Sequence, residues 1–255
     1  MEHGSPILNS TDNSPEAEAN SELTALTVAA FAMASLVETR DSDTVNHILR
    51  IQHYIKTLAQ RLQGQPSFTA VLTDHYIQLL YQLAPLYDMG TMGIPDRILL
   101  KLTSLTPMEH AIMKTHTTLA RDVIAQAERT LGRQSELLTT LKELVFSHHE
   151  KWDGSGYPQG LAGTQIPVSA RLLAIADVYD ALISDRVYKA GIPHDKAVGI
   201  IFQGRGSHFD PDMVDVFMEM QDEFQAIAQR FADTELDMQR KIEYMANAIA
   251  EVAEI

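Results

Sequence analysis

The chain has 255 residues, 45% of them hydrophobic, which is enough for one large domain or two small ones around a buried core. It contains no cysteine, which excludes disulfide bonds and thiolate ligands and leaves histidine and carboxylate side chains as metal donors. The formal net charge of -14 argues against binding to a nucleic-acid polymer, because such binding relies on clustered Lys and Arg.

Two further classes are disfavoured by the distribution of apolar residues. No apolar run approaches the ~20 residues that a membrane-spanning helix needs. The N-terminus lacks the charged and then apolar pattern of a signal peptide. We therefore expect no membrane span and a cytoplasmic location.

The first part of the chain differs in composition from the rest. Residues 1–22 are rich in Ser, Asn, Pro and Glu and show no hydrophobic periodicity, which is typical of a disordered tail or a linker. Helical periodicity begins at Leu23. The sequence therefore predicts a tail over 1–22 and one domain over 23–255.

Apolar residues after Leu23 recur with the spacing of amphipathic helices, and no strand or hairpin pattern is found. Helix-start signals occur at Thr106-Pro107, Ser135 and Asp210-Pro211. The last helix has an apolar face that would pack on the core or on a second subunit, so a homodimer stays open. The sequence predicts an all-α fold with helices at 23–39, 43–63, 69–86, 107–131, 135–149, 167–184, 194–203, 211–230 and 233–253.

The stretch 148–158 combines candidate metal ligands with a glycine-broken loop. His148 and His149 close an apolar helical segment, and the run from Asp153 to Gly156 ends that helix. Adjacent helical side chains diverge by about 100°, so the two imidazoles are better placed for two ions than for one. The pattern favours a site with more than one metal.

Two carboxylates and another histidine are further candidates. Asp43 and His47 are four residues apart, which places them on one helix face, although such a histidine is often structural and Asp43 also suits a first helical turn. Asp177 lies in the apolar run AIADVYDAL, where an unpartnered carboxylate would be costly to bury. A metal would be its natural partner.

The run HHEKWDGSGYP resembles the signature of the HD-GYP family of bacterial metal-dependent phosphohydrolases. The similarity covers roughly residues 36–218 and implies an all-α, multi-helix HD-type bundle with a metal site in its core. It also implies hydrolysis of the second messenger cyclic di-GMP to pGpG or GMP, in signal transduction. The other matching blocks, in family order, are RDSDTVNHILR (40–50), MGIPDRILLK (92–101), LTPMEHAIMKTHT (105–117), IPVSARLLAIADVYDALISDRVYK (166–189) and GSHFDP (206–211).

The resemblance implies a role for each candidate ligand. Asp88 would bridge two cations through its two carboxylate oxygens. His116 and His148 would bind the second cation. His47 and Asp177 would bind the first and, together with Asp88, carry catalysis.

The resemblance also leaves room for a third divalent cation. His149 would face the first or the third cation, and Asp43 stands where the family places an acidic ligand for the third. Nitrogen and oxygen donors without sulfur favour Fe or Mn and leave Zn, Ni and Co open.

The chain departs from the family pattern at two positions of the segment that gives the family the first half of its name. Tyr87 stands where the family has histidine, and Thr91 stands where it has lysine. A phenol, with an ordinary pKa near ~10, must lose its proton to become a good ligand, so Tyr87 would bind the first metal weakly or not at all. An alternative of equal weight is that Tyr87 is a core aromatic residue whose hydroxyl has a hydrogen-bond partner.

Substrate contacts are expected from a loop and from a helix end. The loop offers Gly154, Gly156, Tyr157 and Pro158, where glycine permits close approach of the backbone to a base or phosphate. The resemblance implies that Arg186 and Lys189 contact phosphate. Equally, two cations at a helix C-terminus would interact favourably with the helix dipole.

Two functions are compatible with these residues. The first is a cyclic di-GMP phosphodiesterase, with activity impaired by Tyr87. The second is a catalytically degenerate domain that binds cyclic di-GMP and signals through protein contacts. Many members of the family carry a receiver or sensor domain, so a fused or separate domain of that kind is compatible with either function.

Overall fold

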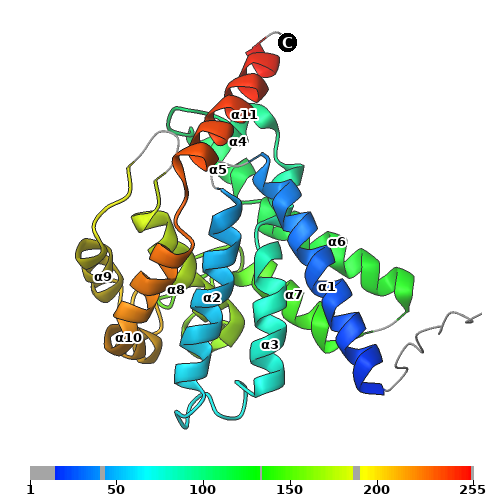
Figure 1. Cartoon of the computed structure of the whole chain (residues 1–255), viewed down its shortest axis with the longest axis vertical. Helices are drawn as coiled ribbons and strands as arrows, with labels where there is room; N and C mark the ends of the chain where they lie inside the picture. Colours follow the sequence, from blue (N-terminus) through cyan, green and yellow to red (C-terminus); the bar gives the residue numbers. More distant parts are fainter. Residues whose placement is uncertain (1–14, 41–43, 133, 186–189, 254–255) are drawn as a thin grey trace, which may run out of the picture.

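The computed structural model describes residues 15–40, 44–132, 134–185 and 190–253, and within them the chain forms helices and no strand (Figure 1). The all-α prediction is confirmed. The α-helices are α1 (Pro15–Glu38), α2 (Val45–Leu62), α3 (Asp74–Leu83), α4 (Asp96–Leu99), α5 (Pro107–Met113), α6 (His116–Leu131), α7 (Glu136–Ser147), α8 (Val168–Ile183), α9 (His194–Gln203), α10 (Pro211–Arg230) and α11 (Glu235–Ala253). The 3₁₀ helices are η1 (Ala84–Leu86), η2 (Met89–Gly93) and η3 (Gly163–Gln165).

The predicted helix starts coincide with side-chain caps. The Thr106 hydroxyl accepts a hydrogen bond from the Glu109 amide, and the Glu109 carboxylate accepts one from the Thr106 amide, which together form a capping box. Ser135 accepts from the amide of Leu138 at the start of α7. Asp210 accepts from the amide of Asp212 at the start of α10. These bonds satisfy amides that have no partner within the helix.

Several elements differ from the prediction. The expected helix 69–86 begins only at Asp74 and is followed by η1, and α4 was not expected. The first helix begins at Pro15 and so extends into the expected tail, because Pro15 suits a first helical position and Glu16, Ala17 and Glu18 are good helix formers. The expected helix 107–131 is divided into α5 and α6. The Thr115 hydroxyl donates to the Ile112 carbonyl, a local bond that competes with the helical ladder at this break.

Helix α2 lies at the centre of the bundle and packs against α3, α8 and α10 (Figure 1). Its inward side chains Ile51, Tyr54, Ile55 and Leu58 are fully buried. The Tyr54 ring stacks on that of Phe224 from α10, with ring centroids 4.6 Å apart. Burying each such side chain is worth about 1.5–3 kcal/mol, so this packing fixes the positions of α2 and α8.

The apolar face predicted for the last helix, α11, is only partly buried. Met245 is buried and Met238 is half-buried, whereas Ile242 is exposed. Lys241, also buried, donates to the carbonyl of Glu38 at the end of α1. The helix therefore packs on the core through part of its predicted apolar face. Within the described ranges, none of the helices has both the length and the hydropathy to cross a bilayer.

The capping box of α5 provides a test of these helix boundaries. Replacing Thr106 by Ala removes the acceptor of the Glu109 amide, so we expect the free energy of unfolding to fall by about 0.5–2 kcal/mol. Urea unfolding followed by circular dichroism measures the change. Thr103→Ala is the matched control, because Thr103 is exposed and lies outside the box. An equal loss in both variants would contradict the capping role.

Candidate metal centre

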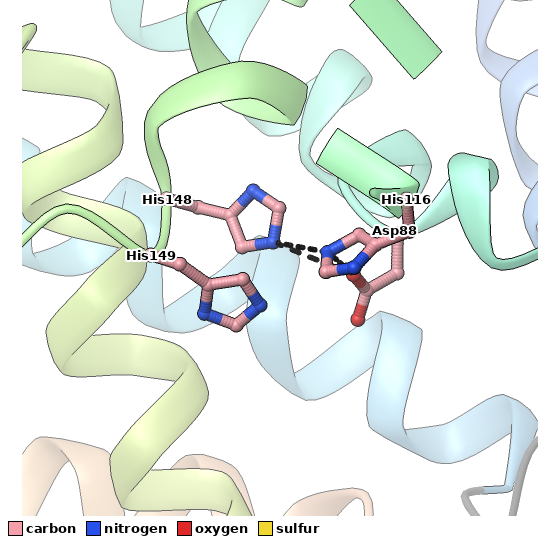
Figure 2. A group of neighbouring side chains, drawn as sticks. All are labelled: Asp88, His116, His148 and His149. Carbon is pink, nitrogen blue, oxygen red and sulfur yellow. Dashed lines mark hydrogen bonds and ion pairs between the residues drawn. The ribbon is translucent and has the colours of Figure 1, made fainter. Parts of the chain in front are cut away.

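Four side chains predicted as metal ligands converge in one place, with His116 and His148 buried and Asp88 and His149 half-buried (Figure 2). Each offers a donor atom, and these atoms all lie within 4.8 Å of one another. Asp88 lies between η1 and η2, His116 opens α6, and the two other histidines follow the end of α7. Residues far apart in the sequence are therefore brought together at helix ends.

The segment that carries Asp88 is held close to α6. Gly90 packs against the backbone of His116, and a Cβ atom at Gly90 would overlap the His116 carbonyl. The buried hydroxyl of Thr91 donates to the Asp88 carbonyl at 2.8 Å. Thr91, which replaces an expected lysine, thus fixes the turn that presents Asp88.

The rings of His116 and His148 are oriented by backbone carbonyls. Nδ1 of His116 lies 2.8 Å from the carbonyl oxygen of Met113, and Nδ1 of His148 lies 2.9 Å from that of Leu144. A carbonyl only accepts, so each Nδ1 carries the proton and donates it. In a neutral ring, Nε2 then presents a lone pair to the centre of the group.

These lone pairs face one another across a short gap. The two Nε2 atoms are 3.3 Å apart, and Oδ1 of Asp88 lies 3.4 Å from each. Three acceptors at this spacing repel one another unless a cation or a proton lies among them. With His149 as a fourth donor, the group fits a divalent transition metal held by imidazole and carboxylate.

A cation in the group would compete with a proton on His148. Burial raises the pKa of Asp88, but the hydrogen bond from His148 and the charges of the neighbouring imidazoles outweigh it and hold that pKa well below its usual range. Burial lowers the pKa of His148, but the hydrogen bond to Asp88 and the charge of that carboxylate outweigh it and raise that pKa. Burial, followed by the charge of His148, lowers the pKa of His149. An imidazole binds a cation in its neutral form, so a cation held by His148 would displace the proton that His148 shares with Asp88.

The glycine loop lies beside the group. A Cβ atom at Gly156 would overlap the backbone of Glu150 and Lys151, and Gly154 has a φ of 81°. The Glu150 carboxylate is buried and accepts hydrogen bonds from the amides of Gln159 and Leu161 at 2.7 and 3.0 Å. The loop that contains Gly154, Gly156, Tyr157 and Pro158 is therefore anchored to the helix end that carries the histidines.

Tyr157 joins this loop to the metal group. Its ring stacks on His149 with centroids 4.7 Å apart and an interplanar angle of 29°. Nζ of Lys114, an exposed side chain, lies 4.8 Å from the Tyr157 ring centroid. The loop thus offers an aromatic face and a cation next to the cluster of ligands.

A second set of predicted ligands, His47, Tyr87 and Asp177, lies next to the first. The Tyr87 hydroxyl donates to Oδ1 of Asp177 at 2.9 Å and lies 3.0 Å from Nε2 of His47. Its ring meets that of His148 edge-on, with centroids 5.3 Å apart. Over the described ranges, neither His47 nor Asp177 joins the group of converging donors, so the predicted ligands fall into two sets.

Comparisons with known proteins show the family of the chain. A family model described as the HD domain matches residues 32–213. The chain belongs to the HD domain family. The expected HD-type fold is confirmed, and the fold is similar to that of a solved structure described as an HDG"Y"P protein from Bdellovibrio bacteriovorus. That structure has a TM-score of 0.50 at 18% identity and covers 79% of this chain and 64% of its own.

Two curated relatives of this HD-domain chain come from Vibrio cholerae serotype O1. One, named a probable cyclic di-GMP phosphodiesterase, is 52% identical over 208 residues, which are 82% of this chain and 47% of the relative. The other, named a cyclic di-GMP phosphodiesterase, is 48% identical over 227 residues, which are 89% of this chain and 46% of the relative. The chain therefore spans about half the length of these relatives.

Two residues that position the HD-domain site are missing from the sequence prediction. Oδ2 of Asp180 lies 2.8 Å from Nδ1 of His47, and Arg50 binds the same carboxylate through Nε and Nη2 at 2.7 and 3.0 Å. Asp180 follows Asp177 by three residues in the same apolar helix, so the burial argument made for Asp177 applies to it as well. That signal was available in the sequence.

Three predicted residues, Asp43, Arg186 and Lys189, lie outside the described residues, so their proposed contacts stay predictions. Lys114 was not predicted, because it lies on the surface in an ordinary helical context and only the fold brings it to Tyr157.

The ligand role of Asp88 is directly testable. Asp88→Ala removes the carboxylate that faces both histidines. Mutating a residue that only hydrogen-bonds to a metal ligand typically lowers metal affinity by about 10- to 100-fold. For a ligand itself we therefore expect the affinity for Mn²⁺ to fall by about tenfold or more. Equilibrium dialysis followed by elemental analysis measures it. Asp122→Ala, on the exposed side of α6, is the control. Equal metal content in wild type and Asp88→Ala would show that Asp88 binds no metal.

Proposed function

We propose that this chain is a metal-dependent phosphodiesterase that hydrolyses cyclic di-GMP to linear pGpG or GMP. The observation that carries the proposal is the convergent group Asp88, His116, His148 and His149 beside the anchored glycine loop. The names of the two relatives from Vibrio cholerae support the choice of substrate.

Different residues of the chain have different roles in the proposed hydrolysis. When bound at the four-residue group, a divalent cation supplies Lewis-acid polarisation of the phosphodiester and a nucleophilic water at neutral pH. Asp88 contributes negative charge, and the carbonyl-fixed rings of His116 and His148 aim their Nε2 lone pairs without reorganisation. Imidazole and carboxylate donors favour Fe or Mn and also accept Zn, Ni or Co.

Substrate binding is assigned to the loop and its neighbours. The Tyr157 ring, backed by His149, presents an aromatic surface on which a guanine can stack. Gly154 and Gly156 leave the loop backbone uncovered for approach to a base or phosphate, with Pro158 completing the turn. Because the chain carries a net charge of -14, phosphate binding needs local cations, and Lys114 supplies one. Arg186 and Lys189 are proposed as further phosphate contacts.

The setting of the domain is also a proposal. The two relatives are about twice as long as the part they share with this chain, which is compatible with a fused or separate receiver or sensor domain. The exposed Ile242 on α11 is compatible with a homodimer through that helix. A cytoplasmic location fits an enzyme that acts on an intracellular messenger.

A second candidate function is a cyclic di-GMP-binding effector without turnover. It is favoured by one observation, the Tyr87 hydroxyl placed between His47 and Asp177, where the family resemblance expects ligands of a metal. In that case the loop would bind the dinucleotide and the domain would signal through protein contacts.

One experiment separates the two functions. The purified chain, loaded with Mn²⁺ or with Fe²⁺ under anaerobic conditions, is incubated with cyclic di-GMP, and pGpG and GMP are measured by chromatography. Binding is measured in parallel by calorimetry. Metal-dependent product that is lost in His148→Ala supports the phosphodiesterase. Binding without product supports the effector, and neither binding nor product would refute both.

The proposed base contact gives a separate prediction. Tyr157→Ala removes the stacking face, so we expect the affinity for cyclic di-GMP to fall by about 1–3 kcal/mol, or roughly 5- to 150-fold, with metal content unchanged. Titration calorimetry measures the affinity. Tyr244→Ala, at an exposed position on the remote helix α11, is the control. An unchanged affinity in Tyr157→Ala would remove Tyr157 from the binding surface.

A further inference from the structure

We propose that this chain holds a single cation, at Asp88, His116, His148 and His149, and that the Tyr87 hydroxyl takes the place of a second cation between His47 and Asp177. The inference deepens the proposed phosphodiesterase, because it assigns its metal content. It runs against the two or three cations that the family resemblance implies.

The Tyr87 hydroxyl occupies the point to which both other side chains are directed. It lies 2.9 Å from Oδ1 of Asp177 and 3.0 Å from Nε2 of His47, and the Tyr87 side chain is buried. Its proton is donated to Asp177, which gives that carboxylate a neutral donor. A phenol binds a divalent cation well only after losing this proton. Hydrogen bonding therefore competes directly with coordination at this position.

His47 is held in this arrangement from behind. Nδ1 lies 2.8 Å from Oδ2 of Asp180, and Asp180 is itself bound by both Nε and Nη2 of Arg50. His47, Arg50 and Asp180 are all buried. Turning His47 towards the Asp88 group would break its buried hydrogen bond to Asp180, so Nε2 stays directed at the Tyr87 hydroxyl.

The two positions are occupied differently. Four donor atoms from four residues converge at the Asp88 group, which meets the usual requirement of three or four protein ligands for a transition metal. At the other position the Tyr87 hydroxyl lies between His47 and Asp177 and is hydrogen-bonded to Asp177.

Metal counting tests the inference independently of turnover. The full chain is dialysed against Mn²⁺, and bound metal is measured by elemental analysis together with the electron paramagnetic resonance spectrum. We expect one Mn²⁺ per chain in the wild type, with the spectrum of an isolated ion. In Tyr87→His an imidazole replaces the phenol, so we expect two Mn²⁺ per chain and an exchange-coupled spectrum.

Tyr87→Phe is the second variant, and it remains informative if the histidine variant fails to fold. It removes only the hydroxyl, so we expect it to keep one Mn²⁺ with unchanged affinity. Circular dichroism verifies folding in each variant. Two Mn²⁺ per wild-type chain, or a loss of metal in Tyr87→Phe, would overturn the inference, since either result makes the phenol or its neighbours ligands. A folded Tyr87→His chain that still binds one Mn²⁺ would also overturn it.

Failure of this inference and failure of the proposed function are distinguishable. A wild-type chain with one Mn²⁺ and no product from cyclic di-GMP would contradict the phosphodiesterase and support the metal count. A chain with two Mn²⁺ and brisk turnover would do the reverse.

Discussion

The candidate site depends on a buried carboxylate, Asp180, that binds Arg50 and His47 at the same time. This interaction ties α2 to α8, and Arg50 extends it to Asp233 at 3.1 Å, between α10 and α11. Removing one partner of such a pair typically costs about 3–5 kcal/mol, because the other charge is left buried. The direction in which His47 points is therefore a property of the whole bundle, and a local change of rotamer cannot alter it cheaply.

Two carboxylates one helical turn apart on α8 show how partners decide the state of a buried acid. Burial raises the pKa of both. For Asp177 the charge of nearby Asp88 adds to burial, and its pKa lies above the usual range although His47, His148 and the Tyr87 hydrogen bond oppose the shift. For Asp180 the hydrogen bond from His47 and the charge of Arg50 outweigh burial, and its pKa lies well below that range. The pKa of Asp177, beside a neutral hydroxyl, and the pKa of Asp180, beside a guanidinium, are therefore shifted in opposite directions.

The sequence was sufficient to predict most of the helices and the candidate ligands that the structure brings together. Helix starts were predictable because caps such as Ser135 and Asp210 act over two or three residues. The meeting of Asp88 with His148 followed from a family pattern and is found in the structure. The role of Tyr87 was not predictable, because it depends on how α2, η1 and α8 pack, and both a ligand and a satisfied core phenol were consistent with the sequence.

The site is built where helices end, and the reason is the hydrogen bonding of the main chain. The last carbonyls of a helix have no amide partner within it, so they are free to accept bonds from side chains. Met113 ends α5 and Leu144 lies in the last turn of α7, and their carbonyls accept from Nδ1 of His116 and His148. Those bonds leave both Nε2 atoms to face Asp88. The breaks in the helices are therefore what converts two histidines into a convergent pair of donors, and a continuous helix from α5 through α6 would tie up the Met113 carbonyl.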